Sequence, residues 1–297
     1  MSQYWEDRFA RWAKPPSDSE TERCENARVA VRKAIDQSPV LANRDVRVTS
    51  QGSYFNNTNV RQESDVDIGV ICYDTFLPEY PPGTQHETFG NRSATYHYAE
   101  FKDDVEKALR DYFGTALVHR GNKAFDIKEN TYHAEIDVAP FFEHRRYAKD
   151  GSFISGVELL PDSGIPSKVI NWPDQHHSNG ITKNTATSRS YKGVIRILKN
   201  LRTDMREAGV DVPDSILGFL IECLLWNVPN DSFLHTGYYE DVRSCLISLY
   251  SDTSTDAACS EWGEVSELKY LFRSSQKWTR VQANTFLLNV WQHVGYK

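Results

Sequence analysis

Two acidic strand patterns about seventy residues apart constrain this chain more than any other feature of its sequence. The first lies in residues 51–71, QGSYFNNTNVRQESDVDIGVI. Because side chains alternate along a strand, Asp65 and Asp67 project from one face while the apolar residues project from the other. Gly69, next on the acidic face, leaves room for a bulky group to approach. Two neighbouring carboxylates repel each other unless a cation lies between them, and such hard oxygen ligands suit Mg²⁺ or Mn²⁺.

The second pattern, YHAEIDV, covers residues 132–138. Its alternation places Asp137 on the face opposite to the apolar residues, together with His133 and Glu135. If this strand lies beside the first, three aspartates converge, and three carboxylates can hold the two divalent ions that in-line phosphoryl or nucleotidyl transfer uses. One ion would bind a triphosphate, and the other would lower the pKa of an attacking hydroxyl.

Gly52 and Ser53 follow a short strand candidate, residues 46–49, at the point where it gives way to a turn or a helix. Free backbone N–H groups and a small hydroxyl at such a point form a phosphate cradle. The Asp-x-Asp pair alone is also typical of a polar strand end. The order of strand, Gly-Ser, Asp-x-Asp and later strand aspartate is more specific, and it favours a site that handles phosphates.

Hydrophobic periodicity divides the chain into a mixed N-terminal part and a helical C-terminal part. We expect strands in residues 46–49, 66–72, 116–119, 124–127 and 132–139, and helices in residues 18–35 and 94–113. Long helical patterns follow in residues 173–184, 188–208, 215–226, 238–250 and 277–293. The predicted fold class is therefore α+β, with a core domain in residues 1–160 and a helical domain in residues 161–297.

The composition narrows the class of protein and its setting. The chain has 297 residues and a formal net charge of −7, which argues against non-specific coating of nucleic acid because that requires clustered Lys and Arg. The longest apolar run, residues 216–226, is too short to cross a bilayer, so we expect no membrane association. Five widely spaced cysteines without a C-x-x-C pair favour a reducing cytoplasm.

A basic stripe accompanies the acidic strands. Lys192, Arg196 and Lys199 recur at helical spacing on one side of their predicted helix, with apolar residues on the other side. Such a stripe either binds phosphates or is an ordinary solvated helix face. In the next helix, an apolar run, Phe219 can be an ordinary core residue. Asn179, before Gly180, can be a turn residue.

These motifs resemble a known family. Gly-Ser, Asp-x-Asp and a later strand aspartate form the pattern of the nucleotidyltransferase superfamily built on the polymerase-beta-like palm. The stretches QGSYFNNTNVRQESDVDIGV, HHSNGITKN, YKGVIRILKNLR and FLIECLLWNVP are similar to the bacterial cGAS/DncV-like nucleotidyltransferases (CD-NTases), over roughly residues 45–230. The resemblance implies a bilobed α+β fold. A palm with a mixed sheet and flanking helices would be joined to a C-terminal helical lobe, with the active site in the cleft.

The resemblance also implies roles for individual residues. The catalytic and metal-binding residues would be Asp65, Asp67 and Asp137, which would hold two Mg²⁺ ions, with Mn²⁺ as an alternative. The nucleotide-binding residues would be Gln51, Gly52, Ser53, Arg196, Lys199, Phe219 and Asn179. Among these, Phe219 would stack on the donor base and Asn179 would contact the edge of a base. The chain departs from the family's usual Pro-Ser-aromatic sequence before Phe219, so the role of Ser215 stays open.

The implied function is synthesis of a cyclic oligonucleotide signal, a cyclic dinucleotide by preference, from ATP, UTP or GTP in bacterial anti-phage (CBASS) defence. A downstream effector would sense the product. The zinc insertion through which animal relatives bind double-stranded DNA has no counterpart here, so DNA activation is not expected. Two alternatives stay open: nucleotidyl transfer to a protein or tRNA, and a catalytically silent nucleotide sensor. The sequence also leaves open the bases, ring size, linkage, activating signal, effector and oligomeric state.

Overall fold

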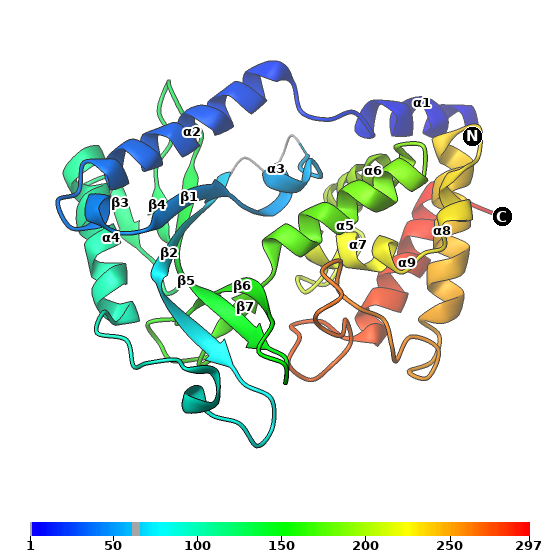
Figure 1. Cartoon of the computed structure of the whole chain (residues 1–297). Coiled ribbons are helices and arrows are strands. Elements are labelled where there is room, and N and C mark those ends of the chain that lie inside the picture. The colour runs from blue at the N-terminus through cyan, green and yellow to red at the C-terminus, as the bar shows by residue number, and fades with distance from the viewer. Residues whose placement is uncertain (1, 61–65) are drawn as a thin grey trace. The chain divides into compact units, whose positions relative to one another are not determined.

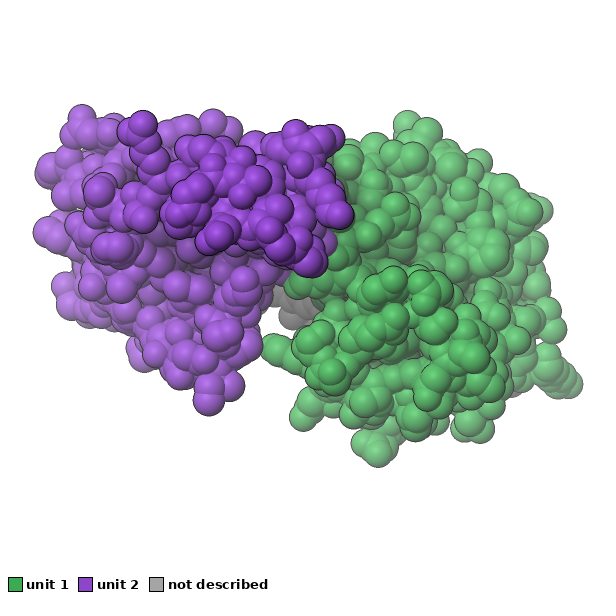
Figure 2. Space-filling view, turned by 60° about the horizontal axis from the view of Figure 1, so that its bottom comes forward, with its two compact units in different colours: residues 1–16, 55–62, 174–297 green, residues 17–54, 63–173 purple. Residues whose placement is uncertain are grey.

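The structure of the chain is a computed structural model, and the residues it describes are 2–60 and 66–297. Packing divides the chain into two compact units, which Figure 2 distinguishes by colour. The sheet unit comprises residues 17–54 and 63–173, and the helical unit comprises residues 1–16, 55–62 and 174–297. Along the chain, the sheet unit ends at residue 173 and the helical unit resumes at residue 174. These units describe how the chain packs, so the predicted domain boundary after residue 160 stays a prediction.

The sheet unit is built on a mixed sheet. Its described strands are β1 (Val46–Ser50), β2 (Val66–Glu79), β3 (Val118–Arg120), β4 (Phe125–Ile127), β5 (Ile136–Tyr147), β6 (Phe153–Leu159) and β7 (Val169–Asn171). They follow the order β1-β2-β5-β4-β3, and β6 pairs with the distal half of β5 and with β7. β2 and β5 are parallel, whereas the other pairs are antiparallel. The predicted α+β class with a mixed sheet is confirmed.

β2 and β5 both run further than the sequence pattern predicts, and each includes a proline. β2 continues through Pro78, but β1 accompanies it only as far as Cys72, so the distal half of β2 has one described neighbour. Pro140 of β5 lies after the residues paired with β4 and before those paired with β6. Proline lacks the N–H that a second neighbour would need, which explains why it is tolerated at both places.

Two long helices cover this sheet with apolar side chains. α2 (Asp18–Asp36) begins at the N-cap Ser17, which forms a capping box with Glu20, and α4 (Tyr98–Phe113) ends at Gly114. The two helices pack against each other. Their buried faces share one core with the strands, which includes Val31, Phe101, Leu109, Ile68 and Val138. The shorter elements of this part are η1 (Leu41–Asn43), α3 (Gly52–Asn56) and η2 (His86–Phe89).

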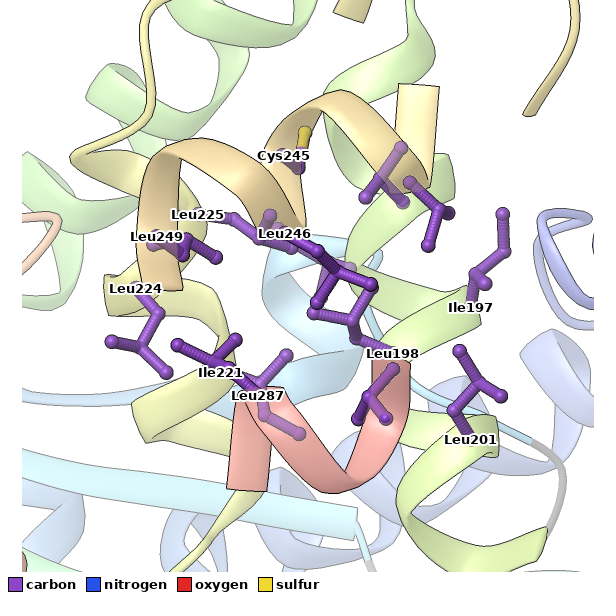
Figure 3. Packing of buried hydrophobic residues seen from close by; sticks show 14 of the residues in the cluster. Ile197, Leu198, Leu201, Ile221, Leu224, Leu225, Cys245, Leu246, Leu249 and Leu287 are labelled. Carbon is purple, nitrogen blue, oxygen red and sulfur yellow. The ribbon is translucent and has the colours of Figure 1, made fainter. Parts of the chain in front are cut away.

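The helical unit is organised around the long helix α6 (Ser190–Glu207), against which several other helices of the unit pack (Figure 1). Its elements are α1 (Ser2–Trp12), α5 (Pro173–Ala186), α6 (Ser190–Glu207), α7 (Gly218–Trp226), η3 (Asn230–Phe233), α8 (Tyr238–Asp252) and α9 (Arg280–Val294). Figure 3 shows the core, where Ile197, Leu198 and Leu201 of α6 gather with Ile221, Leu224 and Leu225 of α7, Cys245, Leu246 and Leu249 of α8, and Leu287 of α9. Full burial of each large apolar side chain contributes about 1.5–3 kcal/mol.

The N-terminal helix α1 belongs to this helical core. Trp5 and Phe9 are buried in it, and the Glu6 carboxylate accepts hydrogen bonds from the backbone N–H groups of Tyr238 and Tyr239 at 3.1 and 2.6 Å. A negatively charged carboxylate at the N-terminus of α8 also interacts favourably with the positive end of the helix dipole. Residues far apart in the sequence therefore complete one unit. In the part of the chain that the structure describes, no helix is both long and apolar enough to cross a membrane.

Candidate functional site

The parallel pair of β2 and β5 brings two of the predicted aspartates together. Asp67 and Asp137 are partners in the register of the two strands, so their side chains share a face of the sheet. Both are partly exposed, whereas the residues that flank them, Val66, Ile68, Ile136 and Val138, are buried. The predicted convergence is thus confirmed for this pair. Asp65 lies outside the described residues.

Gly52 lies directly against the Asp67 carboxylate. A Cβ added at Gly52 would come within 2.0 Å of Asp67 Oδ2, and the φ angle of Gly52 is +61°, in the left-handed region that favours glycine. The backbone N–H of Gln51 donates a 2.8 Å hydrogen bond to the Asp67 carbonyl. The Gly-Ser turn and the first aspartate strand are therefore one local structure, in which only glycine fits. The phosphate-binding role of Gly52 and Ser53 stays a prediction.

The space above Gly69 is filled by a neighbouring side chain, so the expectation that Gly69 leaves room for a bulky group is wrong. A Cβ at Gly69 would lie 2.9 Å from Gln51 Nε2, which donates a 3.1 Å hydrogen bond to Thr49 Oγ1. Thr49 and Gly69 are partners across β1 and β2, which explains why Gln51 can lie over the glycine. Gln51 thus packs within the sheet unit, and its predicted contact to a nucleotide remains a prediction.

The second acidic strand begins at Ile136, so the predicted strand start at Tyr132 is wrong. The side-chain Oδ1 of Asn130 accepts hydrogen bonds from the backbone N–H groups of Tyr132 and His133, at 2.8 and 3.0 Å. This Asx turn holds the segment away from strand geometry. As a result, His133, which the alternation predicts on the same face as Asp137, is buried at 2% exposure. Tyr132, which the alternation predicts on the apolar face, is 52% exposed.

Sequence reasoning missed a third aspartate beside this pair. Asp126 of β4 is the register partner of Asp137, so Asp67, Asp137 and Asp126 form a row across three neighbouring strands. Asp126 is partly exposed between the buried Phe125 and Ile127. The signal that could have found it was this alternation in a short strand candidate next to the second acidic strand.

The donor set fits a divalent metal. Two partly exposed carboxylates on adjacent strands are hard oxygen ligands of the kind that Mg²⁺ and Mn²⁺ prefer, and no side chain at Gly52 covers Asp67. Within residues 2–60 and 66–297, no three His, Cys, Asp or Glu side chains gather closely enough to hold an ion by themselves. Asp65, the third predicted ligand, lies outside these residues.

The basic stripe on α6 is buried inside the helical unit, so the alternative of a solvated helix face is wrong. The exposed fractions of Lys192, Arg196 and Lys199 are 8%, 6% and 1%. Arg196 donates to the carbonyls of Ala13 and Asn57, and burial lowers the pKa of its guanidinium to about 10. Lys199 Nζ lies 2.9 Å from a carboxylate oxygen of Glu222. The predicted contacts of Arg196 and Lys199 to a triphosphate stay predictions.

Phe219 and Asn179 both belong to the helical unit. Phe219 is 38% exposed, and its ring lies 5.6 Å from that of His176 and 6.0 Å from that of Trp278. It is therefore not a core residue, in contrast to one of the alternatives considered. Asn179 lies within α5, and its side-chain amide donates a 2.8 Å hydrogen bond to the Val265 carbonyl. The turn alternative for Asn179 is wrong, and base contacts remain predictions for both residues.

A cavity of about 850 Å³ opens in the sheet unit at the other end of β2 from Asp67. It is lined by Arg44, by residues 74–78 of β2 and by the loop around residues 91–97. None of the described residues that line it belongs to the predicted site, so we do not assign it to the chemistry of the acidic strands.

Comparison with known proteins identifies the family. The family model of the cGAS/DncV-like nucleotidyltransferase C-terminal helical domain matches residues 178–295. A cyclic dipyrimidine nucleotide synthase CdnE of Cecembia lonarensis is 42% identical over 297 residues, with 100% of both chains covered. The chain belongs to the cGAS/DncV-like nucleotidyltransferases. A second cyclic dipyrimidine nucleotide synthase CdnE, of Legionella pneumophila, is 40% identical to this CD-NTase, with 99% of each chain covered.

A solved structure extends the likeness to three dimensions. The Rhodothermus marinus CdnE c-UMP-AMP synthase with Apcpp and Upnpp has a TM-score of 0.86 to this CD-NTase at 29% identity, covering 98% of each chain. The predicted resemblance and fold class are confirmed, and this CD-NTase is a nucleotidyltransferase of the class that synthesises cyclic nucleotides.

Proposed function

We propose that this CD-NTase joins two pyrimidine nucleoside triphosphates into a cyclic dinucleotide, which a downstream effector senses in bacterial anti-phage defence. The in-register pair of Asp67 and Asp137 beside Gly52 carries the assignment to nucleotidyl transfer. The choice of pyrimidines rests on the relatives, since two cyclic dipyrimidine nucleotide synthases are 42% and 40% identical to this chain, against 34% for a cyclic dipurine nucleotide synthase of Elizabethkingia meningoseptica. No observation favours transfer to a protein or tRNA, or a silent sensor.

The residues of the acidic strands would hold the metal ions and orient the reacting groups. Asp65, Asp67 and Asp137 would bind two Mg²⁺ or Mn²⁺ ions, which supply charge neutralisation of the triphosphate and a lowered pKa of the attacking hydroxyl. A ribose hydroxyl of one nucleotide attacks the α-phosphate of the other and loses its proton, and pyrophosphate leaves. A second attack of the same kind closes the ring and releases a second pyrophosphate. Gly52 lets the Gly-Ser turn lie against the Asp67 carboxylate, where a larger side chain would displace it.

Contacts to the base would come from the helical unit. Phe219 offers a partly exposed aromatic face that His176 and Trp278 hold in place. The side-chain nitrogen of Asn179 is committed to the Val265 carbonyl, so its carbonyl oxygen is the group we assign to the base. A carbonyl acceptor can pair with the N3–H of uracil or the amino group of cytosine.

Labelled nucleotides test the proposal directly. The protein is incubated with Mg²⁺ and a mixture of NTPs with one radiolabelled and one left out in turn, and the products are treated with phosphatase and identified by mass spectrometry. We expect a phosphatase-resistant product that requires UTP or CTP and forms without ATP and GTP. A resistant product that carries a purine label would overturn the choice of pyrimidines, and transfer of label to a protein or tRNA would overturn cyclisation.

A further inference from the structure

Glu222 is a carboxylate inside an otherwise apolar helix. It lies in the middle of α7, GFLIECLLW, and its exposed fraction is 4%. Removing a lone carboxylate from water is strongly unfavourable unless it is paired and hydrogen-bonded. Its presence at a core position therefore calls for partners that compensate the charge.

Three elements of the helical unit supply those partners. Lys199 Nζ of α6 lies 2.9 Å from Glu222 Oε1, and the Thr58 hydroxyl donates a 2.7 Å hydrogen bond to the same oxygen. His176 Nε2 of α5 lies 3.1 Å from Oε2. Burial by itself would raise the pKa of Glu222, but Lys199, His176 and Thr58 lower it below its ordinary value. The carboxylate is thus ionised and fixed from three directions.

Thr58 lies in the sequence between the Gly-Ser turn and the first acidic strand, and it belongs to the cluster around Glu222. It lies five residues after Ser53 and nine before Asp67, which both belong to the sheet unit, whereas residues 55–62 pack with the helical unit. Thr58, Asn59 and Val60 are 2%, 3% and 5% exposed, and Arg196 donates to the Asn57 carbonyl. Interior hydrogen bonds therefore hold Asn57 and Thr58, which follow the Gly-Ser turn along the chain.

We propose that Glu222 is a positioning residue for nucleotidyl transfer, which rests on the function proposed above. By holding Thr58 it fixes residues 57–60, which continue the chain directly from α3 and so anchor the helix that begins at Gly52 and Ser53. By pairing with Lys199 it also fixes the ammonium that the family resemblance assigns to the triphosphate. Glu222 itself touches no reacting atom in this proposal.

Thr58→Val tests the link with little change in volume. A substitution at Glu222 would leave Lys199 and His176 buried without their carboxylate and could prevent folding. We expect Thr58→Val to lower kcat about tenfold or more, because small misplacements of catalytic groups have large effects on rate. KM for the NTPs stays within about twofold, and Thr58→Ser, which keeps the hydroxyl, restores kcat to within about threefold of the wild type.

Thr253→Val is the matched control. Thr253 is also fully buried in the helical unit, and its hydroxyl donates a 2.7 Å hydrogen bond to the Leu249 carbonyl. Both variants lose a buried hydroxyl, so both should lower the thermal unfolding midpoint by a few degrees. Only Thr58→Val should lower kcat. An unchanged kcat in Thr58→Val, or an equal loss in Thr253→Val, would overturn the proposal.

A measurement without turnover separates this proposal from the proposed function. Amide hydrogen exchange in residues 55–60 should quicken about tenfold in Thr58→Val and stay unchanged in Thr253→Val. Kinetics use whichever NTPs the wild type incorporates, so a product with purines would overturn the pyrimidine proposal alone. If the wild type consumes no NTP, the exchange comparison decides, and unchanged exchange in Thr58→Val counts against the role of Glu222.

Discussion

In the sheet unit three aspartates form a row on neighbouring strands and stay partly exposed, whereas in the helical unit the charged side chains of Lys192, Arg196 and Lys199 on α6 and of Glu222 on α7 are buried. Asp67, Asp137 and Asp126 stand next to like charges, and Lys199 and Glu222 stand next to opposite ones. Like charges side by side lower stability unless a cation joins them, but paired buried charges cannot be lost singly without a large cost. Substitutions in the aspartate row should therefore impair activity first, and those that remove one member of the buried Lys199–Glu222 pair should impair stability first.

The largest effect is expected for Asp67→Asn and Asp137→Asn. Each removes a charge from the predicted metal ligands, so the rate of product formation from labelled NTPs should fall by about a thousandfold or more. The free energy of unfolding should stay constant or rise by about 0.2–1 kcal/mol because repulsion within the row is relieved. Asp126→Asn is the matched control at the third position of the row and should lose no more than about tenfold. An equal loss in all three would place Asp126 among the ligands.

Gly52→Ala should impair activity next most strongly. The new methyl group would meet the Asp67 carboxylate at 2.0 Å, so one of the two must shift, and we expect the rate to fall about a hundredfold. Gly83→Ala separates this clash from backbone strain, because Gly83 has a φ of +82° with nothing within 4 Å of an added Cβ. That control should lose about 1 kcal/mol of stability and keep its activity. Normal activity in Gly52→Ala would contradict the close approach.

In the helical unit, Lys199→Met should act on stability. It leaves Glu222 charged and buried, which is expected to lower the free energy of unfolding by about 3–5 kcal/mol in a denaturant titration. Lys107→Met removes the partner of Asp111 in an exposed pair on α4, with side chains 72% and 64% exposed, and should cost less than about 1 kcal/mol. Equal losses would remove the contrast between buried and exposed charges.

The smallest effect concerns pH. Lys183 donates to the Val228 carbonyl, and burial lowers the pKa of its ammonium to about 8. Between pH 8 and 10 the unfolded chain keeps a proton that the folded chain has lost, so the stability contributed by this residue rises with pH. Relative to Lys183→Met, the wild type should gain about 1–2 kcal/mol between pH 7.5 and 9.5 in thermal unfolding. A difference that does not change with pH would mean that the three aromatic rings around Lys183 offset its burial.

Local sequence patterns predicted those features that depend on neighbours along the chain. The alternation in β2, the placement of Asp137 and the apolar side of α6 follow from period and spacing. The burial of Lys199, the filling of the space above Gly69 by Gln51 and the inclusion of Trp5 in the helical core depend on what packs against each residue. Helical spacing shows which side chains share a face, but it does not show whether another segment covers that face.

The grouping of residues 1–16 and 55–62 with the helical unit has a consequence for how such enzymes can be recombined. The helical part is not a cassette that begins near residue 174. A chimera that exchanges residues 174–297 alone would keep the recipient's own Trp5, Glu6 and Thr58 against a foreign core, although α8 takes its N-terminal cap from Glu6 and α7 takes a hydrogen bond from Thr58. Exchange between family members should therefore carry all three stretches together. For the same reason, substitutions in one stretch should be accompanied by substitutions in the other two during evolution.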